Sequence, residues 1–309
     1  MASNLSRRDF MRSAAVFSAL GVAPHFLTRT VDAAADPIAG FKDDRVLVVV
    51  QLGGGNDGLN TVVPYSDDAY YRVRPKIGLK KDRIIRINDD VAFNHRCKDM
   101  MRLYDDGKLA IVQGVGYPNP DRSHFRSTEI WETASKSNEY LGTGWIGRYF
   151  DHQCSGSARP QVGVAITEQR PQSFDSERGL GVAFENPYHF GWRPGQGVDN
   201  EANFAAMNAP RGNGEDNLDF LRHVTSNAIM SSKEIREAAE KAKLRYDTNI
   251  PFHRSLDTVA ALIRGDLDTR IYYVSATGFD THANQLGQHD NLWQQVSAGL
   301  GRFHDRLRK

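Results

Sequence analysis

The run RVLVVVQL over residues 45–52 is followed directly by the turn GGGNDG over residues 53–58. An unbroken valine-rich run is typical of a strand that is buried on both faces, as in a parallel sheet covered by helices. The glycines that follow allow positive φ values where the chain must leave the sheet. This stretch therefore predicts an α/β fold whose first strand ends at a polar, glycine-rich turn.

Strands and helices are predicted to alternate along the rest of the chain. Apolar runs predict further strands at 109–113, 162–166 and 270–275, and periodic patterns predict helices at 96–106, from Asp121 past Trp131, and at 218–243, 255–264 and 285–307. Residues 184–217 are rich in Gly, Asn and Pro, which favours long loops or an inserted cap within the region 184–250. The alternation predicts a three-layer α/β/α sandwich with a mostly parallel sheet, formed by residues 36–309.

The first 35 residues have the pattern of a twin-arginine signal peptide. Arg7 and Arg8 precede a short apolar stretch at 14–23, and the small residues 33–35 offer a cleavage site. The apolar stretch is about half as long as the roughly 20 residues of a membrane-spanning helix. We expect export by the twin-arginine translocase to the periplasm, or to another extracytoplasmic location, and no stable membrane span in the mature chain. The alternative is a basic amino terminus that arose by chance on a cytoplasmic protein.

The charge and cysteine content of the chain limit the classes of binding partner and metal site that we expect. The 39 Lys and Arg residues balance 38 Asp and Glu residues, so a net charge of +1 gives no electrostatic reason for a nucleic acid or an anionic membrane as partner. The two cysteines, Cys97 and Cys154, can form one disulfide in an oxidising compartment or remain as two buried thiols. Their spacing does not fit a zinc knuckle.

Three polar motifs follow predicted strands, and the carboxyl ends of parallel strands share one edge of a sheet, where binding sites form. The first motif is GGNDGLNT at 54–61. It lacks the G-x-G-x-x-G spacing of a dinucleotide-binding turn. Asp57 instead offers a carboxylate that can ligate a metal; the alternative is an Asp-Gly turn without chemistry.

The second motif, DRSHFRS at 121–127, places the Ser123 hydroxyl in the first turn of a predicted helix. Free N–H groups and the helix dipole favour anions there. A serine at such a position can attack a phosphoryl or sulfuryl centre while Arg122 or Arg126 neutralises the charge. The alternative is an ordinary helix start at which the serine only caps the helix.

The third motif, GFDTH at 278–282, is the most specific of the three. Asp280 and His282 are two residues apart after a predicted strand, so both side chains can turn toward one cation. Oxygen and nitrogen ligands of this kind suit zinc, manganese or another divalent metal. His289 lies on the following predicted helix, either as a further ligand or on the surface. The alternative is an Asp-capped turn with an exposed histidine.

Five motifs occur in order along the chain and, together with the signal peptide, resemble a known family. They are GGNDGLNTVVPY at 54–65, GVGYPNP at 114–120, RSHF at 122–125, GWIGR at 144–148 and GFDTH at 278–282. The chain is similar to an uncharacterised family of twin-arginine-exported bacterial proteins, catalogued as a domain of unknown function. That family is grouped with the alkaline phosphatase and sulfatase superfamily.

This resemblance implies an alkaline-phosphatase-like fold and a metal-assisted hydrolytic site. By position, Asp57, Asp280 and His282 match metal ligands of the superfamily, and Ser123 best matches the nucleophile, although Thr61 offers a second hydroxyl near the first motif. The resemblance implies an exported hydrolase that acts on small anionic phosphate or sulfate esters.

The sequence also departs from the family pattern. Members usually continue beyond the helix at 285–307, with further strands and a second Asp-His pair of metal ligands. Three explanations stay open: the chain is truncated, the site is completed otherwise, or two-metal chemistry is lost. A missing strand would leave a sheet edge unpaired and predicts association or poor solubility. The alternative function is a non-catalytic exported binding protein on the same fold, with binding loops at 184–217.

Overall fold

The computed structural model describes residues 45–153, 160–177, 181–191, 206, 209 and 217–308. The predicted signal peptide, Cys154 and most of the loop-rich stretch after residue 191 lie outside the described residues. The chain divides into two compact units. The sheet unit comprises Leu47–Gly116, Ala158–Pro171 and Leu180–Lys309, and the helical unit includes Tyr117–Ser157 and Gln172–Gly179.

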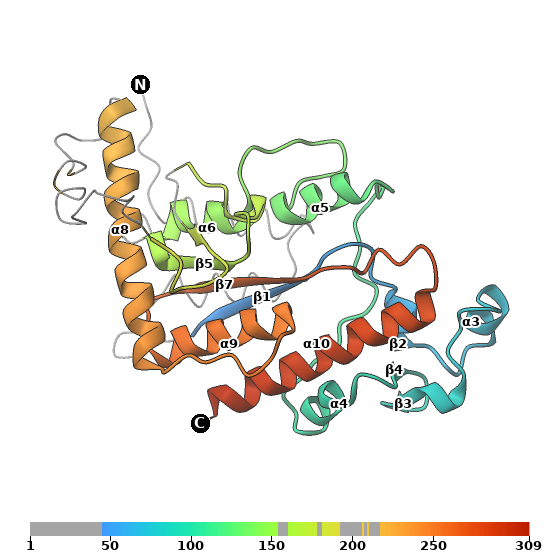
Figure 1. The fold of residues 1–309 in the computed structure, drawn as a ribbon. Coiled ribbons are helices and arrows are strands. Elements are labelled where there is room, and N and C mark those ends of the chain that lie inside the picture. Colours follow the sequence, from blue (N-terminus) through green and yellow to red (C-terminus); the bar gives the residue numbers. More distant parts are fainter. Residues whose placement is uncertain are drawn as a thin grey trace, which may run out of the picture. The chain divides into compact units, whose positions relative to one another are not determined.

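The sheet unit contains a four-stranded parallel sheet flanked by helices (Figure 1). The strand order is β1-β7-β5-β6, with bounds β1 Leu47–Leu52, β5 Gly163–Ile166, β6 Val182–Ala183 and β7 Ile271–Ala276. The predicted α/β class is thus confirmed, as are the strands predicted at 45–52, 162–166 and 270–275.

β1 differs from the prediction in its burial. All six of its residues are half-buried, whereas every residue of β5 is buried. The reason is its place in the sheet: β1 is at the edge of the described strands and pairs only with β7, while β5 has a neighbour on each side. The valine-rich run indicated the strand correctly but not its edge position.

The strand predicted at 109–113 does not form. Leu109 and Ile111 pack against the core, but Ala110, Val112 and Gln113 are exposed. A strand needs a neighbour to complete its backbone hydrogen bonds, and no strand of the described residues pairs with this segment. An apolar run alone does not provide that neighbour.

A second, antiparallel sheet was not predicted from the sequence. Its order is β2-β4-β3, with bounds β2 Val62–Val63, β3 Ile84–Arg86 and β4 Ala92–Asn94. These strands have two or three residues each, too few to produce a clear alternation of apolar and polar side chains. The helix α3, Asp68–Val73, begins at Asp67, whose carboxylate accepts a hydrogen bond from the Ala69 amide.

Long helices complete the sheet unit. The predicted helices are confirmed as α4 Lys98–Asp105, α8 Asn217–Lys241, α9 Pro251–Arg264 and α10 Gln285–Leu307. α9 begins four residues before the predicted 255, because Pro251 occupies its first turn, where its missing N–H is not needed. α9 packs against β7 and β5, and α10 packs against α9 and α4. None of the helices that the structure describes combines the length and apolar character needed to cross a membrane.

The core of the sheet unit joins the sheet to these helices. Its fully buried members include Val164, Tyr272, Val274, Phe279 and Leu262. Cys97 is also fully buried there, and this burial, with the nearby charge of Asp290, raises the pKa of its thiol to about 12. A thiol with so high a pKa is unreactive near neutral pH.

The helical unit consists of α5 His124–Thr133, α6 Trp145–Gln153 and a 3₁₀ turn at Gln172–Phe174. Both helices pack against that turn, and the Phe150 and Phe174 rings meet edge to face with centroids 5.6 Å apart. Gly144 allows the close approach of the two segments, because a Cβ there would overlap the backbone of Gln172 and Ser173.

Candidate functional site

The turns that follow β1 and β7 are joined by backbone contacts. Gly53 donates a hydrogen bond to the Ala276 carbonyl (2.8 Å), and Phe279 donates one to the Gly53 carbonyl (3.1 Å). Gly54 has φ +109°, and a Cβ there would lie 2.5 Å from the Asp280 amide nitrogen. The first and third polar motifs therefore share one edge of the parallel sheet, as the sequence predicted.

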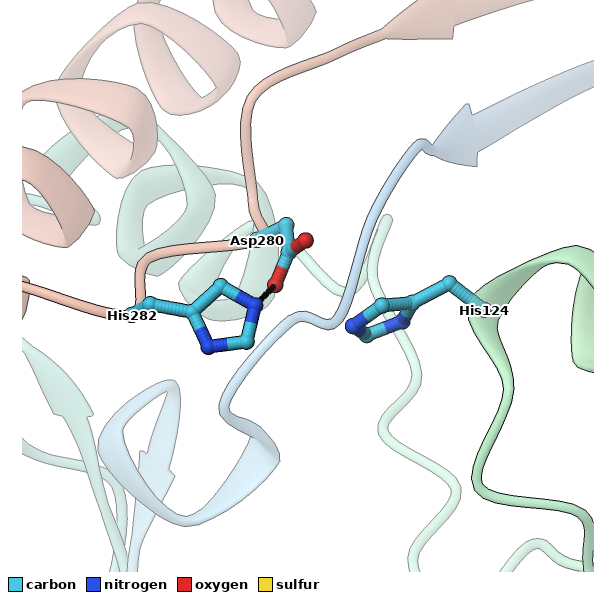
Figure 2. A group of neighbouring side chains, drawn as sticks. All are labelled: His124, Asp280 and His282. Atoms are coloured by element: carbon cyan, nitrogen blue, oxygen red, sulfur yellow. Dashed lines mark ion pairs between the residues drawn. The ribbon is translucent and has the colours of Figure 1, made fainter.

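Asp280 and His282 form an ion pair on the segment that follows β7 (Figure 2). His282 Nε2 lies 2.7 Å from Asp280 Oδ1, and the two side chains are 81% and 43% exposed respectively. A carboxylate oxygen and an imidazole nitrogen are thus held together at the surface of the sheet unit. Such a pair can present both atoms to a cation that arrives from solvent.

Asp57 lies in the turn after β1, in a less exposed setting. Its side chain is 12% exposed, and Arg74 Nη1 lies 2.6 Å from its Oδ2 atom. The Gln285 side-chain amide, at the start of α10, donates to the same oxygen. A guanidinium from the end of α3 therefore supplies the positive charge beside this carboxylate.

A buried polar network lies next to Asp57. The Asn56 side-chain oxygen contacts His289 Nε2 at 3.1 Å and accepts from Trp293 Nε1 at 3.2 Å. The Thr61 hydroxyl donates to the Asp57 carbonyl at 2.9 Å, so this second candidate nucleophile is engaged with the backbone. The network fixes the turn that carries Asp57.

His289 lies in the interior and not on the surface. It is 1% exposed, on the first turns of α10. Burial lowers the pKa of its imidazole, against the raising effect of the Asp57 and Asp290 charges. His289 Nε2 contacts the Asn56 side-chain oxygen at 3.1 Å and also accepts a hydrogen bond from Trp293 Nε1 at 3.2 Å.

A cleft of about 720 Å³ opens beside Asp57 within the sheet unit. Its charged lining residues are Asp57 and Arg74, and Asn56, Thr61, Gln113 and Gln285 add neutral polar groups. Exposed aliphatic side chains also line it, among them Leu59 (46% exposed) and Val112 and Val115 (75% each). A volume of several hundred Å³ is typical of small-molecule sites, and polar side chains form a large part of this lining.

The second polar motif belongs to the helical unit. Ser123 is the N-cap of α5, which begins three residues after the predicted start at Asp121, and the Ser123 hydroxyl accepts a hydrogen bond from the Arg126 amide at 3.5 Å. The Asp121 carboxylate instead accepts from the Ser123 amide at 2.7 Å. Ser123, Arg122 and His124 are all exposed (Figure 2 labels His124 at the start of α5).

Arg126 has a different environment from Arg122. It is 8% exposed, and its Nη2 atom donates to the Lys136 and Ser137 carbonyls at 3.1 and 3.2 Å and also to the Glu139 carbonyl. Its guanidinium also stacks on the Tyr140 ring, 4.0 Å from the centroid. These contacts hold the loop after α5, and they leave Arg122 as the arginine of this motif that solvent and ligands can reach.

The sequence did not indicate Arg74 or Gln285 as site residues. Arg74 lies 17 residues beyond Asp57 in the chain, and Gln285 lies 228 residues beyond it, with no motif linking them. Two features of the sequence pointed toward these residues. Gln285 is the first residue of a predicted helix shortly after GFDTH, and Arg74 directly precedes Pro75. Side-chain contacts across such separations require the folded structure.

Comparison with known proteins adds no relative: no protein-family model, no curated protein and no solved structure matches this chain. The site is therefore interpreted from its own chemistry.

Proposed function

We propose that this protein is an exported metal-dependent hydrolase of phosphate or sulfate esters, with an alkaline-phosphatase-like three-layer fold. The observation that supports it most is the meeting of the β1 and β7 turns, where Phe279 donates to the Gly53 carbonyl and Gly54 packs on Asp280. Both turns carry carboxylate or imidazole side chains, which are common ligands of divalent metals. In parallel sheets, this edge is where ligands bind.

The Asp57, Asp280 and His282 side chains are of types that bind a divalent cation, and in this structure their ligand atoms do not all lie within 4.8 Å of one another. Asp57 and Asp280 offer carboxylate oxygens and His282 offers an imidazole nitrogen, a donor set suited to zinc or manganese. Asp57 already holds a cationic group, the Arg74 guanidinium, 2.6 Å from its Oδ2 atom. We place His289 behind Asp57, as a group that positions the turn through Asn56, and not among the first three ligands.

A divalent ion held by these residues would supply Lewis-acid polarisation of the ester oxygen. The nucleophile in this proposal is Ser123, whose hydroxyl is exposed at the start of α5. Its Oγ forms a bond to phosphorus or sulfur as the ester oxygen leaves as the alcohol, and water then cleaves the serine ester. Arg122, also exposed, donates N–H groups to the charge that develops on the non-bridging oxygens.

Elemental analysis tests the metal directly. The mature chain, purified from the exported fraction without chelators, should carry about one tightly bound divalent ion. Asp280→Ala and His282→Ala should each lose the ion and abolish hydrolysis of phosphate and sulfate esters. Asp89→Ala and His189→Ala are matched controls, because both residues are exposed and lie outside the two turns.

The nucleophile is tested separately. Ser123→Ala should retain the ion and lose turnover, whereas Ser127→Ala, on the next turn of α5, should keep both. A well-folded protein that holds no ion even after supplementation would overturn the hydrolase proposal. It would favour a non-catalytic exported binding protein instead.

A further inference from the structure

Two arginines and a histidine face one buried carboxylate oxygen on α10. The Oδ2 atom of Asp290 pairs with the Arg83 guanidinium. His95 Nε2 and Arg96 Nε lie 3.4 and 3.9 Å from the same oxygen. Two guanidiniums thus share one carboxylate, and no other acidic side chain in the described ranges forms an ion pair with either of them. One positive charge is therefore left over at this place on the sheet unit.

Hydrogen bonds to the backbone hold this cluster in place. Arg83 directly precedes β3 and His95 directly follows β4, and the His95 amide donates to the Arg83 carbonyl at 3.1 Å. His95 Nδ1 lies 3.2 Å from the same carbonyl oxygen. The Arg96 amide donates to the Asn94 side-chain oxygen at 3.0 Å, and Asn94 Nδ2 donates to Asp290 Oδ1 at 3.0 Å. A site whose parts are held in advance loses little conformational entropy when a ligand binds.

Both guanidiniums keep N–H groups that a ligand can reach. The Arg83 and Arg96 side chains are 34% and 41% exposed, whereas the Asp290 side chain is 4% exposed. Arg83 uses Nη2 for Asp290, and Arg96 Nε is buried without a hydrogen-bond partner. The other guanidinium nitrogens of both arginines make no hydrogen bond within the described part of the chain, and none of them is a buried unpartnered atom. Their N–H groups are therefore open to solvent.

We propose that Arg83 and Arg96 form a binding site for a tetrahedral oxyanion, phosphate or sulfate, on the side of α10 that faces the small sheet. Guanidinium groups present planar N–H forks that match the paired oxygens of such an anion. The uncompensated positive charge attracts the anion, and the carboxylate that would repel it is nearly buried. This inference goes beyond the proposed hydrolase, because neither arginine belongs to the proposed hydrolytic site and the binding needs no metal.

Titration calorimetry of the mature chain with sodium sulfate tests the site. Arg96→Gln should weaken sulfate binding about tenfold, the low end of the range for hydrogen bonds to a charged group. Arg96 Nε lies 3.9 Å from Asp290 and forms no hydrogen bond with it, so this variant should unfold at the same urea concentration as wild type. The control is Arg102→Gln. Arg102 is 39% exposed and lies 3.1 Å from Asp305 and 3.7 Å from Asp99, so its charge is already compensated and its loss should leave sulfate binding unchanged.

Asp290→Asn distinguishes a ligand site from a purely structural ion pair. Removal of this negative charge leaves both guanidiniums uncompensated, so sulfate should bind about threefold more tightly, as expected for the loss of one nearby repelling charge. Sulfate should also raise the unfolding midpoint of Asp290→Asn more than that of wild type, because a ligand stabilises the folded state that binds it. A structural ion pair alone predicts neither effect.

The titration is repeated with EDTA, because the proposed metal site can also bind sulfate. Binding that EDTA leaves unchanged and that Arg96→Gln weakens supports the arginine site. Three results would overturn it: no binding of sulfate to wild type at millimolar concentrations, equal affinities of Arg96→Gln and Arg102→Gln, or binding that disappears with EDTA. None of these results bears on whether the protein is a hydrolase, which the metal analysis of Asp280→Ala decides.

Discussion

Gly54 packs against the backbone of Asp280, so closely that a Cβ atom at Gly54 would lie 2.5 Å from the Asp280 amide nitrogen. Gly54 also has φ +109°, a conformation that other residues rarely adopt. The place of a predicted metal ligand after β7 thus depends on the absence of a side chain after β1. Two segments more than 200 residues apart are fitted to each other at the level of the backbone.

Gly54→Ala tests this dependence. We expect it to lower the free energy of unfolding by about 2–4 kcal/mol, since backbone strain and overpacking each cost roughly 1–3 kcal/mol. It should also weaken metal binding, because the Asp280 segment must shift. Gly58→Ala is the control, because no atom lies within 4 Å of the added methyl group. Urea unfolding and Zn²⁺ titration measure both effects; equal stability of the two variants would contradict the packing described.

Asp290 is the buried charge that joins α10 to the small sheet. It is 3% exposed, and its carboxylate meets Arg83, His95 Nε2 at 3.4 Å and the Asn94 amide at 3.0 Å. Asp290→Asn leaves the Arg83 guanidinium without its counter-charge. We expect a loss of about 1–3 kcal/mol in the free energy of unfolding, the range for a buried group that loses a charged hydrogen-bond partner, since Arg83 is 34% exposed and water can solvate its charge.

The control for this loss is Asp305→Asn. Asp305 also pairs with an arginine, Arg102, at 3.1 Å, but its side chain is 51% exposed. Water can solvate Arg102 in place of the lost carboxylate charge at little cost in free energy. The urea midpoint of Asp305→Asn should therefore equal that of wild type within error. Equal urea midpoints for Asp290→Asn and Asp305→Asn would contradict the prediction that burial makes the contacts of Asp290 more stabilising than those of Asp305.

The sequence predicted the parts of this fold that local patterns encode. The valines of β1, the amphipathic pattern of α9 and its stop at Gly265 were sufficient to place these elements within a few residues. It also predicted that the motifs after β1 and β7 share an edge, because parallel strands leave little choice. These inferences need only periodicity, turn residues and the geometry of a parallel sheet.

Other features depend on contacts that no local pattern records. The segment 109–113 has the composition of a strand, yet it lacks a neighbouring strand among the described residues, and the β2-β4-β3 sheet is too short to show a period. Arg74 could not be identified as a site residue from the sequence, because only its contact with the Oδ2 atom of Asp57 places it at the site. Nor could the sequence show that the Arg126 guanidinium pairs with the Glu129 carboxylate at 2.8 Å and also donates to backbone carbonyls of the loop after α5.

The loop after α5 depends on two arginines of the helical unit. Arg126 donates to the carbonyls of Lys136 and Ser137, and Arg148 donates to that of Thr143 at 2.6 Å. Burial lowers the pKa of the Arg148 guanidinium. Arg126→Met and Arg148→Met should each expose the loop at 134–143 to limited proteolysis, seen as faster cleavage by mass spectrometry. Arg122→Met should not, because Arg122 is exposed; faster cleavage in that variant would count against this assignment.

His289 makes stability depend on pH. Burial lowers its pKa below the ordinary 6.5, so the folded protein takes up this proton less readily than the unfolded chain. Above pH 6.5 the imidazole is neutral in both the folded and the unfolded state, so its titration does not lower the free energy of unfolding. As the pH falls below 6.5, the unfolded chain binds the proton first, and the free energy of unfolding decreases until the folded state is also protonated.

His289→Gln should therefore flatten this decrease, because glutamine carries no proton in this range. The measurement is urea unfolding of metal-free protein from about pH 7.5 to about pH 5.5, the range in which histidines titrate. His189→Gln, which changes an exposed imidazole, should keep the wild-type slope. Parallel curves for wild type and His289→Gln would show that the buried imidazole is not the source of the acid sensitivity.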